Sequence, residues 1–198
     1  MRTKRGEKEK LRALILDRTV AYLKTHGRSG AGTGPMMRHA GLTRGALYSH
    51  FASKDDLFAR AVCHDLARLE DTLAKRFREG GRAAIKMMIE DHLSEASLTD
   101  VEGGCVFTSL ATDMQRSKPE HRKLYEAHMD RIYKMFADAL RGQFPHATSA
   151  QRSEKAFNLY SGLVGTLAMA RTMKDPNHAR RILSAGKRFL IEQFAAHS

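Results

Sequence analysis

The sequence predicts an all-α fold in which a small helical domain is followed by a larger one. Apolar residues recur every three or four positions along most of the chain, which is the spacing of one helix face. Glycine, proline and polar loops divide these stretches, and neither an alternating strand pattern nor an internal repeat interrupts them. A chain of 198 residues with 42% hydrophobic content can build a small domain joined to a larger one. We place the boundary between 1–57 and 58–198.

The charge of the chain is concentrated at its start. Of a net charge of +12, residues 1–57 hold 12 Lys/Arg against 5 Asp/Glu, a net +7, which leaves 22 against 17, or +5, for the remaining 141 residues. Such an excess favours an anionic partner, either nucleic acid or a membrane surface. No run of about 18 apolar residues and no hydrophobic signal segment is present, which predicts a cytoplasmic protein. Cys63 and Cys105 are too few for a disulfide framework and are expected to be reduced thiols.

The chain begins with a charged stretch and then an amphipathic helix. Residues 2–10 are expected to form a flexible basic arm, which either lies along phosphates or serves as a solubilising tail. Residues 11–26 are predicted to be helical, and Gly27 is expected to end that helix. The glycines of the loop that follows match no phosphate-binding loop, because no strand precedes them and no Gly-Lys-Ser/Thr follows.

Two short helices and a tight turn come next. Thr33 can cap a helix that runs to Ala40 with Pro35 in its first turn. Gly41 tolerates the positive φ that a tight turn requires, and a further helix is predicted over Thr43–Phe51. The pattern predicts a helix-turn-helix.

The helix Thr43–Phe51 separates its side chains into two arcs when they are placed at about 100° per residue. The outer arc suits a groove of DNA, because a guanidinium forks to a guanine edge or a phosphate, a glycine lets the backbone approach, and hydroxyls donate to phosphates. Taken alone, this arc is equally explained as the solvated side of a surface helix. The outer arc holds Arg44, Gly45, Tyr48 and Ser49, and the inner arc holds Ala46, Leu47 and Phe51, with His50 among them.

A long helix is predicted to follow and to link the two domains. Ser53 and Asp56 have the spacing of a capping box at its start. Its apolar stripe continues to Gly80, far enough to leave the first domain and enter the second. The stripe consists of Phe58, Val62, Leu66, Leu69, Leu73 and Phe77.

Residues 10–62 resemble the DNA-binding domain of TetR-family transcriptional regulators. The resemblance rests on the ordered string A-G-L-T-R-G-A-L-Y-S-H-F-A-S-K-D-D-L-F, Ala40 to Phe58, behind an amphipathic first helix. Met37 stands where the family usually has a small residue, and Met36 takes the apolar position ahead of it. The rest of the chain is similar only in length and helicity.

The resemblance implies a homodimeric regulator, a repressor, whose partner is double-stranded operator DNA. Arg44, with Gly45 beside it, is then expected to recognise base edges. Periodicity alone favours a buried His50, whereas the resemblance favours a phosphate donor, and both alternatives stay open. The implied phosphate contacts are Thr33, Thr43, Tyr48, His50 and Lys54.

The second domain is predicted to be entirely helical, over 83–96, a short segment after Gly104, a helix from Pro119 to Leu140, and the last two helices at 153–173 and 177–194. The last two carry broad apolar faces and three glycines, which allow a four-helix contact between two copies across a twofold axis. The alternative is that these faces complete the core of one chain. The candidate interface residues are Phe157, Tyr160, Val164, Leu167, Ile182, Gly186, Phe189 and Leu190.

The resemblance further implies a small-molecule effector, of unknown identity, that enters the second domain and releases DNA. Each candidate for the pocket lining is also explained as ordinary core. Cys105 follows two glycines at a predicted helix N-terminus, where the helix dipole favours a thiolate that would sense oxidants or electrophiles; a small buried hydrophobe is the alternative. The lining candidates are Met88, His92, Cys105, Phe107, Leu110, Met114, His128, Ile132, Phe157 and Tyr160.

Other functional classes find little support in the sequence. No signature links Cys63 or Cys105 to a histidine and an orienting group, so we do not predict an enzyme. Neither Cys63-His64 nor His121 with His128 has metal-ligand spacing, and no cofactor is predicted. A peripheral membrane protein would need one strongly amphipathic basic helix, whereas the basic excess here is spread over several short elements.

Overall fold

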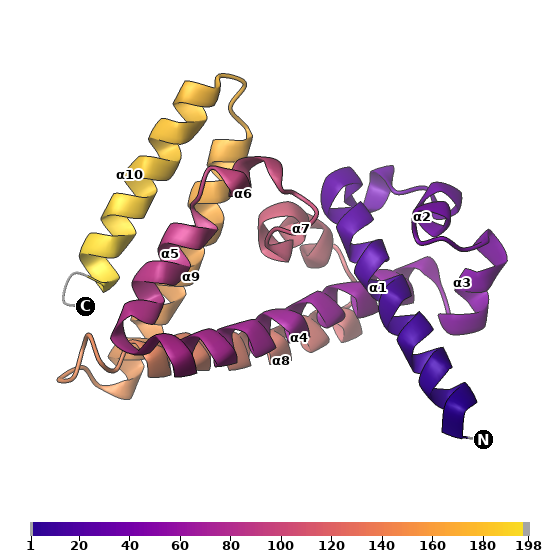
Figure 1. Cartoon of the computed structure of the whole chain (residues 1–198), viewed down its shortest axis with the longest axis horizontal. Helices are drawn as coiled ribbons and strands as arrows, with labels where there is room; N and C mark the ends of the chain where they lie inside the picture. The colour runs from indigo at the N-terminus through magenta and orange to yellow at the C-terminus, as the bar shows by residue number, and fades with distance from the viewer. Residues whose placement is uncertain (1, 196–198) are drawn as a thin grey trace. The chain divides into compact units, whose positions relative to one another are not determined.

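The computed structural model describes residues 2–195, except for the side chains of residues 2–5, 44, 46 and 82. All regular structure in this range is helical, which confirms the all-α prediction (Figure 1). The helices are α1 Arg2–Gly30, α2 Thr33–His39, α3 Arg44–His50, α4 Lys54–Gly80, α5 Ala84–His92, α6 Ala96–Thr99, α7 Val106–Gln115, α8 Pro119–Ala139, α9 Ser149–Arg171 and α10 Pro176–Phe194, with a 3₁₀ turn at Gly81–Ala83 before α5.

The chain forms two compact units that are not continuous in sequence. The first contains Met1–Arg68 and Val101–Glu126, and the second contains Leu69–Asp100 and Ala127–Ser198. Helix α7 and the start of α8 thus belong to the same unit as α1, α2 and α3. The sequence-based boundary after residue 57 divides the chain into two continuous segments. Each compact unit instead combines two separate segments that contact each other in space.

Helix α1 organises the first unit. It begins at Arg2, so residues 2–10, which were expected to be a flexible arm, form the first turns of the helix. Gly27 breaks it with φ 66° and ψ 166°, a conformation that glycine adopts without a steric penalty. Helix α1 packs against α2 and α7. Its inner face is inaccessible to solvent at Ile15, Val20 and Leu23.

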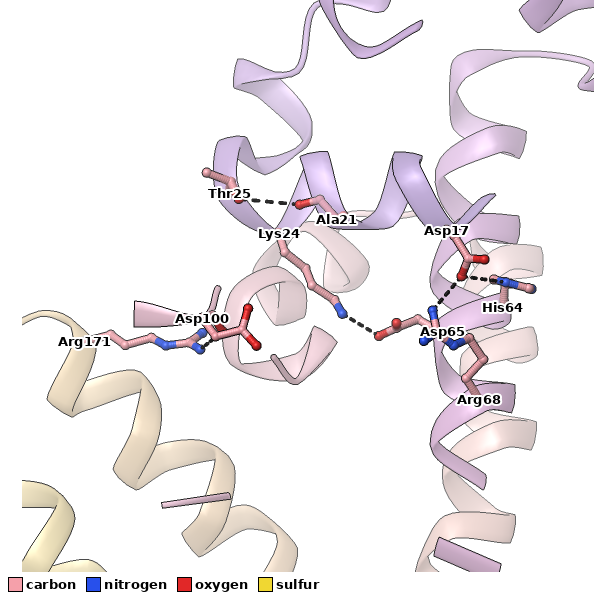
Figure 2. Close-up of polar contacts among 9 residues, drawn as sticks. All are labelled: Asp17, Ala21, Lys24, Thr25, His64, Asp65, Arg68, Asp100 and Arg171. Atoms are coloured by element: carbon pink, nitrogen blue, oxygen red, sulfur yellow. Dashed lines mark hydrogen bonds and ion pairs between the residues drawn. The ribbon is translucent and has the colours of Figure 1, made fainter. Parts of the chain in front are cut away.

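Polar pairs join α1 to the part of α4 that lies in the same unit (Figure 2). Lys24 Nζ lies 2.9 Å from Asp65 Oδ2, and the Lys24 side chain is only 2% exposed. Asp17 Oδ1 accepts hydrogen bonds from Arg68 at 2.5 Å and from His64 at 3.1 Å. A buried charge is costly to leave without its partner, so the Lys24–Asp65 pair favours one alignment of the two helices.

Helices α9 and α10 form the tightest pair of the second unit and run side by side in opposite directions (Figure 1). Thr148 and Gln151 make a complete capping box at the start of α9, and Asp175 caps α10. The two helices approach closely where a Cβ added at Gly162 would lie 2.8 Å from Leu190 Cδ2, and one added at Gly186 would overlap Thr166. Gly162 and Gly186 therefore allow α9 and α10 of one chain to pack closely against each other.

Among residues 2–195, no helix is both long and apolar enough to cross a membrane.

Candidate nucleic-acid interface and effector region

The turn between α2 and α3 is built on Gly41. Its φ is +75°, as expected for a tight turn, and a Cβ added there would lie 2.9 Å from Arg18 Nη1. Arg18 Nη1 donates to the carbonyl of Ala40 at 3.2 Å, while the Leu42 amide donates to the carbonyl of Met37 at 2.8 Å. These contacts fix the angle at which α3 leaves α2.

Helix α3 is anchored by Leu47 and Phe51, which are 1% and 3% exposed. On the opposite side, Gly45 is exposed and Tyr48 is 62% exposed. Thr43 is the N-cap residue of α3, but its hydroxyl makes no capping hydrogen bond. A glycine and two hydroxyl-bearing side chains therefore lie at the surface around a seven-residue helix.

The remaining predicted DNA contacts differ in their surroundings. The backbone of Arg44 begins α3, and its side chain lies outside the described part of the structure. Thr33 was expected to cap α2; Gly32 is the N-cap, and Thr33 is the first helical residue. His50 is half-buried, with its ring centroid 6.3 Å from that of Phe51, so its role as a phosphate donor stays a prediction.

Lys54 and its neighbours form a polar cluster that sequence patterns did not indicate. Lys54 Nζ donates to the carbonyl of Arg28 at 3.1 Å, and the guanidinium of Arg28 donates to Asp55 Oδ1 at 2.6 Å. This hydrogen bond from Arg28 holds the pKa of Asp55 below its usual value. Ser53 caps α4 as predicted, since its hydroxyl accepts from the Asp56 amide at 3.0 Å. The Ser53 cap could be predicted from neighbouring residues, whereas the Arg28–Asp55 contact could not, because these two residues are far apart in sequence.

Two family sequence models match this chain. Residues 15–61 match the bacterial regulatory proteins of the tetR family, and residues 81–185 match the tetracyclin repressor-like C-terminal domain. The chain belongs to the TetR family. It is accordingly a DNA-binding transcriptional regulator and not an enzyme, as the sequence predicted. The first match covers the whole helix-turn-helix.

Several solved bacterial structures share the fold of this chain at low sequence identity. The reduced form of E. coli NemR superposes with a TM-score of 0.74 at 18% identity, covering 90% of this chain and 96% of that one. A TetR-family regulator from Agrobacterium tumefaciens gives 0.76 at 16%, covering 94% and 98%. FadR from Bacillus subtilis, in complex with stearoyl-CoA, gives 0.62 at 14%, covering 93% and 98%. No curated protein sequence matches the chain.

The predicted effector residues are divided between the two units. Cys105, Phe107, Leu110 and Met114 belong to the first. Cys105 is the N-cap residue of α7, as expected for the residue after two glycines, and is half-buried. Leu110 and Met114 are buried on α7, while Phe107 is half-buried.

In the second unit, His128 is held by charged neighbours. Its Nδ1 lies 2.5 Å from Glu70 Oε1, and Arg131 Nε donates to Glu70 Oε2 at 2.9 Å. Burial raises the pKa of Glu70, but the hydrogen bonds from Arg131 and His128 outweigh it and lower the pKa. Because this cluster satisfies Nδ1 of His128 and joins α4 to α8, the residue has a structural role that the sequence did not predict.

His92 differs from the other candidates of the second unit. Its Nε2 is enclosed and has no hydrogen-bond partner. Burial, with the positive charge of Arg171 nearby, lowers the pKa of His92 to about 4, so the ring is neutral at pH 7. Met88, Ile132 and Tyr160 are buried. Phe157 is 46% exposed, and its ring centroid lies 4.6 Å from that of Tyr133. His92 is thus the candidate with an unsatisfied polar atom.

The residues predicted to form a dimer interface differ in their exposure within one chain. Tyr160, Leu167 and Leu190 are at most 5% exposed within one chain, and Gly186 lies against Thr166. These four residues pack the chain's own helices, because a face that meets a neighbouring helix has the same apolar spacing as one that meets a partner. The other four candidates reach the surface at least in part: Phe157, Val164, Ile182 and Phe189.

Proposed function

We propose that the chain is a homodimeric repressor whose α3 enters the major groove of operator DNA. The observation that carries this proposal is the surface around α3, where Gly45 and the hydroxyl-bearing Thr43 and Tyr48 are exposed while Leu47 holds the helix on the core. Arg44 supplies the base-recognising guanidinium, and Thr33, Tyr48, His50 and Lys54 contact phosphates. A protein with these partners acts in the cytoplasm.

The proposed dimer uses the outer faces of α9 and α10. Three of the large apolar side chains exposed in the described structure lie there: Phe157, Met169 and Phe189 are 46%, 57% and 58% exposed. A twofold axis at these faces gives a symmetric regulator that contacts two half-sites.

The proposed effector is a small hydrophobic molecule that binds the second domain and lowers operator affinity. His92 offers it a neutral imidazole whose Nε2 has no hydrogen-bond partner. Depending on the tautomer, Nε2 would accept a hydrogen bond from a ligand hydroxyl or donate one to a ligand carbonyl. The complex of the similarly folded FadR with stearoyl-CoA supports an apolar ligand as the first class to test.

A second candidate is control through Cys105, which would act as a redox or electrophile sensor. Its position as the N-cap residue of the ten-residue helix α7 supports this alternative, as does the similar fold of NemR, whose structure was solved in a reduced form. If N-ethylmaleimide lowers the DNA affinity of wild type but not of Cys105→Ser, the sensor mechanism holds. Equal effects on both proteins would exclude it.

Selection from a random duplex library tests the proposed function. We expect enrichment of a palindrome whose half-sites lie about one helical turn, ~34 Å, or a multiple of it apart. Binding should weaken with rising salt and be unaffected by anionic lipid vesicles. Recovery of no sequence above the unselected library would refute the proposal. Repeating the selection with a panel of hydrophobic compounds and electrophiles would then separate the two effector classes.

A further inference from the structure

Arg28 occupies the corner at which α1 is broken, and three helices of the first unit meet there. Because Gly27 leaves the helical conformation, the Arg28 amide bonds elsewhere and donates to Asp113 Oδ2 of α7 at 3.0 Å. The Arg28 carbonyl accepts from Lys54 Nζ, and its guanidinium donates to Asp55. One residue thus binds α7 through its amide and the first turn of α4 through its carbonyl and side chain.

The surroundings of Arg28 make these contacts strong. Its side chain is 21% exposed, and its guanidinium lies 5.0 Å from the centroid of the Phe58 ring. Hydrogen bonds to charged groups that are partly shielded from water are stronger than those between neutral groups. The α7 partner is also held, because the Ser117 hydroxyl donates to the carbonyl of Asp113 at 3.2 Å and lies 3.3 Å from the Tyr125 hydroxyl.

The corner therefore joins helix α7 to a proposed phosphate contact. Asp113 lies on α7, eight residues after the N-cap residue Cys105. It belongs to the region matched by the C-terminal family model. Lys54, at the other side of the corner, begins α4. A displacement of α7 that lengthened the Asp113 contact would shift Arg28, and with it the carbonyl and guanidinium that hold the start of α4.

We propose that Arg28 is a positioning residue for DNA binding, through which Asp113 of α7 sets the place of Lys54 and the start of α4. The inference rests on the proposed function, since it requires that the surface formed by α3 and Lys54 binds operator DNA. Asp113 itself contacts no DNA, and its contribution is transmitted through the Arg28 amide.

The sign of one substitution separates this proposal from simple electrostatics. Removing a negative charge attracts DNA more strongly, so Asp113→Ala would raise affinity if charge alone mattered. Loss of the Arg28 contact instead lowers operator affinity by about 3- to 30-fold. Asp113→Asn keeps an oxygen acceptor for the Arg28 amide and should restore binding to within about twofold of wild type. Glu126→Ala removes an exposed carboxylate of the same unit and is the matched charge control.

The experiment measures the binding of all variants to the selected operator by fluorescence anisotropy at one salt concentration, after circular dichroism has compared their helical content and melting temperatures. Unchanged or raised affinity in folded Asp113→Ala refutes the proposal. If Asp113→Ala melts at a lower temperature than wild type, the test rests on Asp113→Asn. An equal loss of operator affinity in both variants would contradict a role for the acceptor oxygen.

A double-variant comparison tests whether the two sides of the corner act together. Asp55→Ala removes the guanidinium contact, and the Asp55→Ala/Asp113→Ala protein should lose less affinity than the product of the two single losses, because both contacts hold one residue. Independent, multiplicative losses refute a shared corner. If wild type itself binds no duplex, the proposed function has failed; if wild type binds and Asp113→Ala binds equally well, only the inference about Arg28 has failed.

Discussion

The α2–α3 pair and the α9–α10 pair stabilise their helices by opposite means. Helices α2 and α3 have seven residues each and no side-chain cap, and α3 is held by a few buried residues such as Leu47. Helices α9 and α10 have 23 and 19 residues, side-chain caps at both N-termini, and close contacts at Gly162 and Gly186. A seven-residue helix has little intrinsic stability in water, so α3 depends on its anchors, whereas α9 and α10 support each other.

The difference follows from what each pair contacts. Helix α3 leaves Gly45 and Tyr48 exposed on the surface that we propose binds DNA, so its position depends on the Gly41 turn and on buried Leu47. The α9–α10 pair has enough apolar surface to bury one face and still expose Phe157 and Phe189. Each region therefore has a distinct point of weakness, and substitutions can locate it.

The largest effect is expected at Leu47. Leu47→Ala leaves a cavity beneath α3 and should destabilise the first unit by about 2–5 kcal/mol, with loss of DNA binding. Leu124→Ala, at a side chain that is 49% exposed, is the control and should cost less than about 0.5 kcal/mol. Urea unfolding followed by circular dichroism measures both. Retention of full stability and DNA binding by Leu47→Ala would show that α3 has anchors other than Leu47 and Phe51.

The same substitution at two glycines should have opposite effects in the α9–α10 pair. Gly186→Ala places a methyl group against Thr166 and should lower stability by about 1–3 kcal/mol. Gly165→Ala enters open space and should raise stability by up to about 1 kcal/mol through helix propensity. Thermal unfolding of the two variants checks this. Equal shifts of the melting temperature in one direction would contradict the close contact at Gly186.

Acid should weaken the second unit through His92. The unfolded ring, with a pKa near 6.5, takes up a proton at a higher pH than the folded ring, whose pKa is about 4, so the stability present at neutral pH is lost as pH falls between these values. The loss between pH 7.5 and pH 5 is about 2 kcal/mol. His92→Gln should flatten this dependence, and the exposed His146→Gln should not. Urea unfolding at both pH values measures it, and an equal slope in wild type and His92→Gln would contradict the assignment.

The smallest effect is expected at Lys54, whose ammonium already donates to the Arg28 carbonyl. Lys54→Ala should weaken binding to all duplexes alike and lower the slope of log affinity against log salt by about one unit. Lys134→Ala, at a lysine paired with Asp138 in the second unit, should leave the slope unchanged. An unchanged slope in Lys54→Ala would mean that Lys54 only supports the corner at Arg28.

Local signals in the sequence predicted the helix-turn-helix well. The positive φ of Gly41, the cap at Ser53 and the inward Leu47 depend on residues within a few positions of each other. The cap of α2 was misplaced by one residue, because Gly32 and Thr33 both suit a helix start.

Contacts between distant residues were not predictable in the same way. Arg28 meets Asp113 across 85 positions, and His128 meets Glu70 across 58, with no motif linking either pair. Apolar spacing identified α9 and α10 as helices with apolar faces. It could not show that Leu167 faces its own chain while Phe189 faces outward, because both follow the same helical period.

Competition between the selected operator and a scrambled duplex of equal length, with wild type and Arg44→Ala at one salt concentration, tests the central claim most directly. We predict that wild type prefers the operator by at least about 10³-fold, and that Arg44→Ala loses about 5- to 150-fold of that preference. If wild type binds both duplexes equally, the chain does not recognise sequence. If Arg44→Ala keeps the full preference, α3 recognises bases without Arg44.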